Sequence, residues 1–223
     1  MFKYRWIAEN IIYFRFDSAK DMYAAMMRFQ EHYESPKFRG KSFTHKEFNE
    51  WYKKKYGKNY SGWVGFNFPG YVYRTASDVM RLTKREKAVA KVFDKCGRKK
   101  FYVIATIEDD ALDHEIAHAM YYLDSRYRTQ ARAEAKKITA SPLYKDFKEM
   151  GYCDEVLEDE LNAYLATGNP KEDSWPFRHG ADGRQLKILF ERYKDKNVWK
   201  LKANQSWIKE EAADSSLKTR RSR

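Results

Sequence analysis

Hydrophobic and polar positions alternate in two regions of the chain, and this pattern predicts β-strands. Residues 1–16 alternate loosely and are rich in Ile, Tyr and Phe, which favour a half-buried pleated surface. Residues 101–107 read Phe-Tyr-Val-Ile-Ala-Thr-Ile, a run typical of a buried strand. We therefore expect one strand in each region.

A helical period dominates the rest of the chain. Ser18 is placed to cap a helix that runs to about Tyr33. Thr44 and Glu47 have the spacing of a capping box, so a second helix is expected to begin there and to end at Gly57. Further helices are expected at 83–95, 111–124, 126–137, 142–150, 154–167 and 184–194.

Two segments that are rich in Gly, Pro and aromatic residues, 61–70 and 168–183, are expected to be loops. The sequence has no internal repeat and no low-complexity segment. It therefore predicts one α+β domain over residues 1–195, mostly helical with a small antiparallel or mixed sheet. Residues 196–223 are expected to form a C-terminal extension whose basic end is disordered.

Composition excludes several classes of protein. The chain has 223 residues and two cysteines, too few for a disulfide scaffold or a cysteine-based zinc finger. No segment predicts a signal peptide or a membrane span, so a cytoplasmic location is expected. The formal net charge of +12 would suit a nucleic acid or an acidic partner, although the basic residues are spread along the chain.

The candidate chemistry lies at residues 114–118, which read His-Glu-Ile-Ala-His. On a helix, residues four apart share a face, so His114 and His118 can present two imidazoles to one metal ion. Glu115 then lies beside the metal, where it can take a proton from a water molecule activated by zinc. The flanking residues are apolar and include no Gly or Pro from Ala111 to Asp124, which favours a buried helix whose polar groups need partners.

Periodicity along the helix expected at 154–167 indicates a third metal ligand. Glu160 is three residues from Leu157 and four from Tyr164, so it points inward with this apolar face. The neighbouring acidic residues, Asp159 among them, fall mostly on the outer face. A carboxylate on an apolar seam is unusual unless it is paired with a base or bound to metal. The alternative to metal binding is therefore that Glu160 pairs with an Arg or Lys.

These residues resemble the small gluzincin-type zinc metallopeptidases, which follow His-Glu-x-x-His with a glutamate from a later helix. The resemblance rests on 114–118 and on Asp-Glu-Leu-Asn-Ala-Tyr at 159–164. It implies a zincin-like fold, with a metal-binding core at 101–167 and substrate-side elements at 1–100. The whole chain also looks similar to uncharacterised phage and microbial proteins, through 29–36 and 65–70.

The sequence departs from related zinc enzymes in three ways. After His118 it lacks the glycine and third histidine of metzincins, and His179 is too distant for the third histidine of SprT-like proteases. Cys96 precedes the motif, as in peptide deformylases, but its surroundings do not match theirs. Among candidate oxyanion donors are Tyr164 and His179, together with Tyr122 and Arg178.

The expected function is therefore that of a zinc-dependent hydrolase, most simply a metallopeptidase acting on a peptide or protein. His114, His118 and Glu160 would bind zinc, and Glu115 would act as general base. The alternative is a non-catalytic basic protein that binds nucleic acid and has a structural metal or none. A latent zincin whose cleft is covered by the segment after Asp195 is a third reading.

Overall fold

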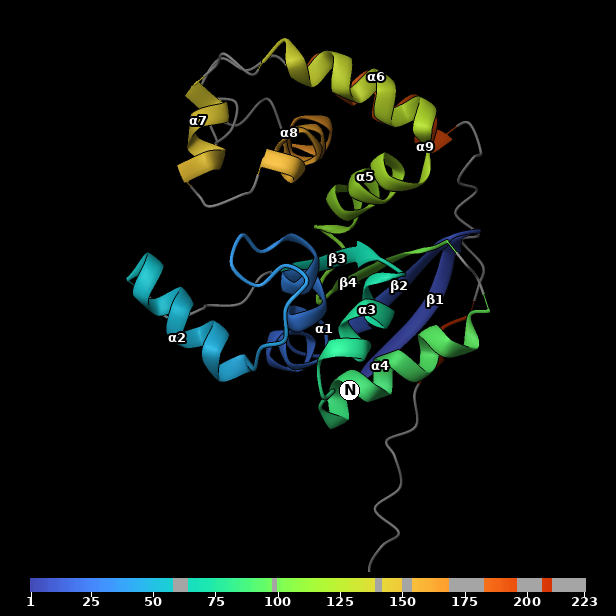
Figure 1. The fold of residues 1–223 in the computed structure, drawn as a ribbon. Coiled ribbons are helices and arrows are strands. Elements are labelled where there is room, and N and C mark those ends of the chain that lie inside the picture. Colours follow the sequence, from blue (N-terminus) through green and yellow to red (C-terminus); the bar gives the residue numbers. More distant parts are fainter. Residues whose placement is uncertain are drawn as a thin grey trace, which may run out of the picture.

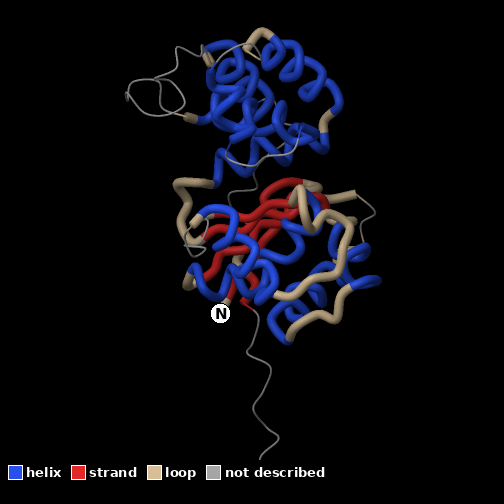
Figure 2. The backbone as a smooth tube through the Cα atoms, turned by 60° about the vertical axis from the view of Figure 1, so that its left-hand side comes forward, coloured by secondary structure: helices blue, strands red, loops and turns tan. Residues whose placement is uncertain are grey.

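The computed structural model describes residues 1–57, 64–97, 100–138, 142–149, 154–168, 183–195 and 206–209. It shows a mostly helical chain built around a mixed sheet, so the expected α+β class is confirmed (Figures 1 and 2). No described helix is both long and apolar enough to cross a membrane.

The sheet has the strand order β3-β4-β2-β1-β5. Strands β1 (Phe2–Ala8) and β2 (Ile11–Phe16) form an antiparallel hairpin, and β4 (Tyr102–Thr106) lies parallel to β2. At one edge, β3 (Gly65–Pro69) pairs antiparallel with β4. At the other edge, the two-residue β5 (Ile208–Lys209) pairs with β1.

Side chains from opposite faces of the sheet enter two separate cores, because successive residues of a strand point to opposite sides. On one face α1 (Ala19–Glu34) packs on β2, β3 and β4. The core there also includes side chains of α2 (His45–Tyr56), α3 (Val72–Val79) and α4 (Lys84–Lys95). On the other face α5 (Leu112–Leu123) packs on β3 and β4. The core around it also includes side chains of α6 (Ser125–Lys136), α7 (Pro142–Glu149), α8 (Asp154–Thr167) and α9 (Arg184–Asp195). In Figure 1 the second group lies above the sheet.

The expected helix caps are confirmed. The Ser18 side chain accepts a hydrogen bond from the Asp21 amide at the start of α1. Thr44 and Glu47 form a reciprocal capping box at the start of α2. Gly57 ends that helix with φ of 70°, a conformation that glycine adopts without steric cost.

Three expectations about the strands are wrong. Residues 1–16 form a hairpin instead of one strand, because the polar pair Glu9-Asn10 turns the chain. The expected loop 61–70 contains β3, whose Phe66 and Phe68 are fully buried, and α3, which was not predicted, follows it. Residues 208–209, assigned to the extension, return to the sheet as β5.

Candidate metal centre

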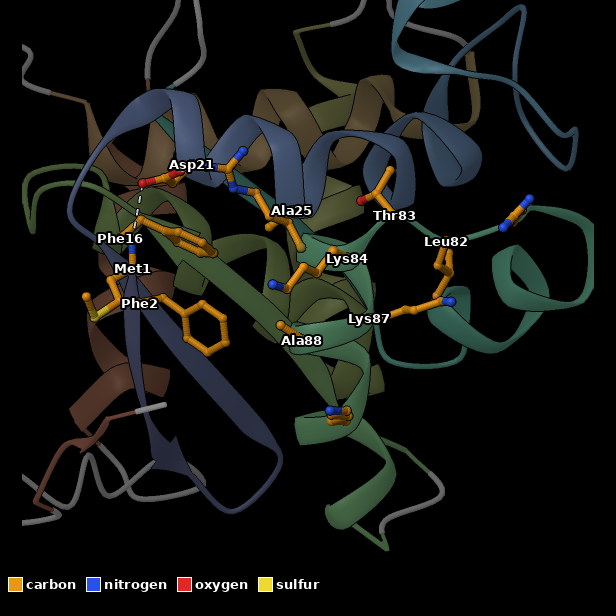
Figure 3. A pocket seen from close by; sticks show the side chains of 13 residues that line it. Met1, Phe2, Phe16, Asp21, Ala25, Leu82, Thr83, Lys84, Lys87 and Ala88 are labelled. Atoms are coloured by element: carbon orange, nitrogen blue, oxygen red, sulfur yellow. Dashed lines mark hydrogen bonds and ion pairs between the residues drawn. The ribbon is translucent and has the colours of Figure 1, made fainter. Parts of the chain in front are cut away.

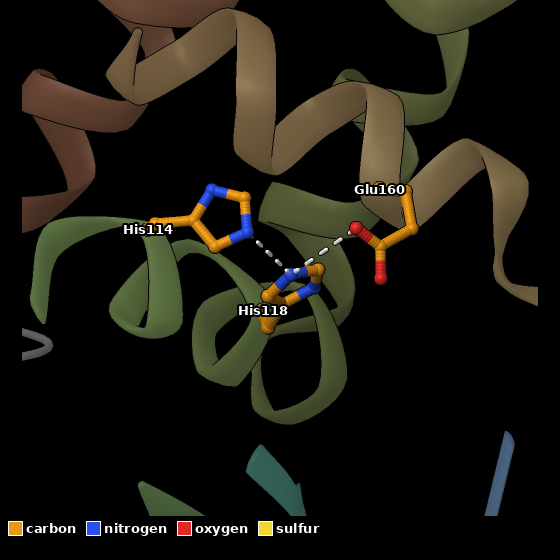
Figure 4. Close-up of side chains that lie close together, drawn as sticks. All are labelled: His114, His118 and Glu160. Atoms are coloured by element: carbon orange, nitrogen blue, oxygen red, sulfur yellow. Dashed lines mark hydrogen bonds and ion pairs between the residues drawn. The ribbon is translucent and has the colours of Figure 1, made fainter. Parts of the chain in front are cut away.

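Helix α5 presents both histidines of the motif toward α8 (Figure 4). The Nε2 atoms of His114 and His118 are 3.3 Å apart, as their spacing of four residues predicts. His118 is 3% exposed, whereas His114 is half-buried. The pair therefore lies on a largely covered part of the helix and not on an open face.

Glu160 of α8 joins the two histidines. Its Oε2 atom is 3.8 Å from Nε2 of His118, and the three candidate ligand atoms all lie within 4.8 Å of one another. The carboxylate is 6% exposed and faces α5 across the helix interface. The structure thus brings together the three residues that the sequence singled out as metal ligands.

Asp159 was expected on the outer face of α8, and this expectation is wrong. Its Oδ1 atom lies 3.1 Å from Nδ1 of His118, on the side of the imidazole opposite Nε2. A carboxylate at this position fixes the orientation of a histidine ring and leaves the other nitrogen free to bind metal. The adjacent acids therefore face different nitrogens of His118, with Asp159 at Nδ1 and Glu160 at Nε2.

Glu115 is fixed by residues of β3 that sequence reasoning missed. The Asn67 side-chain amide donates a hydrogen bond of 2.6 Å to Oε2 of Glu115, and the Tyr102 hydroxyl donates one of 2.5 Å to the Asn67 side-chain oxygen. The backbone amide of Asn67 donates in turn to the side-chain oxygen of Gln30 at 2.8 Å. No local pattern signals these contacts, since Asn67 and Glu115 are 48 residues apart.

Gly65 allows this arrangement because it faces Glu115 without a side chain. Positions 65 and 67 are two apart on a strand and share a face. A Cβ atom at Gly65 would lie 2.2 Å from Oε1 of Glu115, closer than any ordinary contact. Gly65 and Asn67 together therefore form a cradle for the Glu115 carboxylate, which we call the β3 cradle.

Electrostatics around the centre favour an added cation. Burial raises the pKa of Glu115 to about 7 and that of Glu160 to about 8. Burial alone would lower the pKa of His118, but the carboxylates of Asp159, Glu160 and Glu115 outweigh it and raise that pKa to about 10. Burial and the neighbouring His118 lower the pKa of His114 to about 3. The attraction of these carboxylates, which raises the pKa of His118, would act in the same way on a divalent cation.

A pocket of about 180 Å³ opens beside the ligand atoms. Its lining comes from α1, β3, the start of α5, and α8 (Gln30, Val64, Gly65, Asn67, Ala111, His114, Glu115, His118, Glu160 and Tyr164). The Tyr164 ring packs edge-on against His114, with ring centroids 4.6 Å apart. Tyr164 is therefore placed at the pocket, as its position one turn from Glu160 predicted.

The other candidate donors do not join this set. Tyr122 packs against the Tyr102 ring at 5.5 Å and is not among the residues that line the pocket. Arg178 and His179 lie outside the described residues. Cys96 belongs to the core on the opposite face of the sheet, where its thiol donates to the Val92 carbonyl oxygen at 3.1 Å.

The three donors could hold a metal ion, and their spacing can be compared with that around zinc. Tetrahedral zinc with bonds of about 2.0–2.2 Å holds its donor atoms about 3.3–3.6 Å apart. The His114–His118 distance of 3.3 Å lies in this range, the His118–Glu160 distance of 3.8 Å is slightly longer, and all three donor atoms lie within 4.8 Å of one another. A tetrahedral ion held by two imidazoles and one carboxylate would have a fourth position for water or substrate.

Comparison of the chain with protein-family models, curated proteins and solved structures found no match. Its function therefore has to be inferred from the residues of the centre.

Proposed function

We propose that this protein is a zinc-dependent hydrolase, most simply a metallopeptidase. The observation that carries the proposal is the convergence of His114, His118 and Glu160, with Glu115 held beside them by the β3 cradle. A structural zinc site is usually closed by four protein ligands, whereas a catalytic one has three and an open position. Three donors beside a pocket support the catalytic alternative.

A zinc ion bound there would polarise the carbonyl of a substrate and activate water. Glu115 would accept the proton of the attacking water and pass it to the leaving amine. Asn67 would keep the Glu115 carboxylate at the pocket wall, so that this transfer needs no prior rearrangement. Tyr164 lines the pocket, and its hydroxyl would be the candidate donor of a hydrogen bond to the developing oxyanion.

The fold is consistent with the zincin-like architecture that the motif implied. Helix α5 packs against β3 and β4, and α8 packs against α5. This arrangement places the edge strand β3 beside the helix that bears both histidines. The proposal of a zincin-like fold is supported by the placement of α5, α8 and β3 relative to one another.

Metal content tests the proposal first. We expect about one zinc per chain in the purified protein by elemental analysis, and much less in Glu160→Ala. Glu158→Ala is the matched control, because Glu158 lies on the same helix but pairs with Arg132 at 2.6 Å. A protein that takes up no zinc, or a Glu160→Ala variant that binds zinc as well as wild type, would overturn the proposed centre.

Glu115→Gln tests catalysis separately. The variant should retain zinc and folding but lose hydrolysis of unfolded casein or of a fluorogenic peptide library. If wild-type protein binds zinc yet hydrolyses none of these, and Glu115→Gln binds zinc equally well, the centre is structural. Hydrolysis that persists in the zinc-loaded variant would instead exclude Glu115 as the general base.

A further inference from the structure

A large groove lies on the face of the sheet opposite the metal centre (Figure 3). Its volume is about 960 Å³, roughly five times that of the pocket beside the histidines. The floor is apolar and is formed by Phe2, Phe16, Ala25, Leu82 and Ala88. In Figure 3 Phe2 and Phe16 lie on one side, and Lys84, Lys87 and Ala88 of α4 lie on the other. We call this the basic groove.

The wall of the basic groove has a stripe of unneutralised positive charge. Lys84, Lys87 and Lys91 follow one another at spacings of three and four residues, so they lie along one face of α4, and all three are exposed. No residue of the described chain forms an ion pair with any of them. Asp21, the acid that lines the groove, is paired with Arg85 at 2.7 Å.

The acidic residues of α4 do not relieve this repulsion. Glu86 is fully buried and bonded to Arg28, and Asp94 accepts a hydrogen bond from the Tyr73 hydroxyl at 3.0 Å. Lys84 and Lys87 also lie in the first turn of α4, where the helix dipole disfavours positive charge. The stripe thus opposes the stability of the isolated chain, and an anionic partner would reverse that effect.

We propose that the basic groove docks an acidic amphipathic helix of a partner protein. A helix laid along α4 repeats its acidic side chains at the same three- and four-residue spacing as the lysines, while its apolar face enters the floor. A nucleic acid fits less well. Its phosphates could meet the lysines, but its bases need open aromatic faces to stack on. Of the two floor phenylalanines, Phe16 is only 3% exposed, and the ring of Phe2 packs against Phe14 and Phe16.

This docking site does not depend on the hydrolase. Phe2, Phe16, Ala25 and Leu82 of the floor belong to or pack against the core on the α1–α4 side, whereas the histidines lie on α5, which packs on the other face. Occupation of the groove therefore needs no change at the metal centre.

The test uses fluorescence anisotropy with a labelled helical peptide of about 18 residues, or five turns, that has glutamates on one face and leucines on the other. The comparison probes are a scrambled peptide of the same composition, polyglutamate, and single-stranded oligothymidine. The groove variant is Lys84→Glu/Lys87→Glu/Lys91→Glu. The matched control, Lys53→Glu/Lys54→Glu/Lys187→Glu, makes the same change of charge at exposed positions of α2 and α9.

We expect saturable binding of the amphipathic peptide, and at least tenfold weaker binding by the groove variant. Each exposed ion pair is worth about a two- to threefold change in affinity, so three lost pairs give about tenfold before repulsion is added. The affinity of the control variant for the amphipathic peptide should fall by no more than about threefold, because salt screens distant charges. Ala88→Gln, which puts a polar group on the floor and preserves helix propensity, should weaken the amphipathic peptide but not polyglutamate.

Three results would overturn the proposal. One is an equal loss of peptide affinity in the groove variant and the control variant, which would indicate binding by net charge alone. Another is equal affinity for the amphipathic and scrambled peptides. The third is tighter, groove-dependent binding of oligothymidine, which would assign the surface to nucleic acid. Circular dichroism and urea unfolding of each variant confirm that the exposed substitutions leave the fold intact.

Discussion

Adding a single methyl group at Gly65 should impair hydrolysis by displacing Glu115. A Cβ atom there would lie 2.2 Å from Oε1 and 2.9 Å from the carboxyl carbon of Glu115. Ordinary contact begins near 3.4 Å, so either the carboxylate or the strand must move by about 1 Å. The movement would also strain the 2.6 Å hydrogen bond from Asn67 to Glu115.

A misplacement of about 1 Å in a catalytic group can cost about 10²-fold in rate. We therefore expect kcat of Gly65→Ala to fall by about this factor, with KM changed much less, because the ligands that would position zinc and the substrate carbonyl are untouched. The assay is the initial rate of peptide hydrolysis by zinc-loaded protein, with zinc content measured on the same samples. This prediction rests on the proposed function.

Gly70 provides a matched steric control. A Cβ atom at Gly70 would lie 2.5 Å from the ring of Phe101, a comparable clash on the core side of the same segment. Gly70→Ala should therefore destabilise the fold about as much as Gly65→Ala while leaving catalysis of the folded fraction intact. Full activity of folded, zinc-loaded Gly65→Ala would refute the cradle, as would an equal loss of kcat in Gly70→Ala.

Three further predictions follow from the described contacts. Asp159→Ala should weaken zinc binding about 10–100-fold in a chelator competition, because His118 loses the carboxylate that orients it, and unchanged affinity would contradict that role. Glu86→Ala should lower the free energy of unfolding in urea by about 3–5 kcal/mol, since it leaves Arg28 buried without its carboxylate partner; a loss below about 1 kcal/mol would contradict this. Burial raises the pKa of Glu31 to about 8 from its ordinary 4.5, so the unfolded chain releases this proton first as pH rises. The contribution of Glu31 to the free energy of unfolding should be complete below pH 4.5 and be lost progressively up to pH 8. Glu31→Gln should therefore be more stable than wild type by about 3 kcal/mol at pH 7. The same pH dependence of the free energy of unfolding in both proteins would exclude Glu31 as the cause.

The sequence predicted those features that depend on neighbours a few residues away. At the caps of Ser18 and Thr44, the side chain lies within three residues of the amide that donates to it. These caps can therefore be predicted without tertiary information. The same holds for His114 and His118, whose juxtaposition follows from helix geometry alone. Glu160 was found because a single acid on an apolar seam requires a partner.

The strand β3 could not be predicted in this way. Its Gly and Pro residues favour a loop by local rules, but pairing with β4 and burial of Phe66 and Phe68 outweigh that preference. Missing β3 meant missing the cradle, because Asn67 reaches Glu115 only through the packing of the strand on α5.

Asp159 was misplaced for a different reason. The inner face of α8 was inferred from one apolar seam, as if the helix had one buried side and one solvent side. In the structure α8 packs against α5, α6, α7 and α9, so it is enclosed by helices on several sides. An acid away from the main seam can then still face the interior, and Asp159 faces His118 there.

The position of Glu115 supports the proposed hydrolytic centre over a structural one. A purely structural metal would need its ligands and their orienting groups, which α5 and α8 provide between them. It would not need a glutamate that lines the pocket beside the ligands, accepts a hydrogen bond from an asparagine of the edge strand, and lies against a glycine that admits no side chain. Because the Glu115 pocket and the basic groove lie on opposite faces of the sheet, charge reversal on α4 should change partner affinity while leaving zinc content and hydrolysis at wild-type levels. Binding and chemistry in this protein would then be separable by substitution.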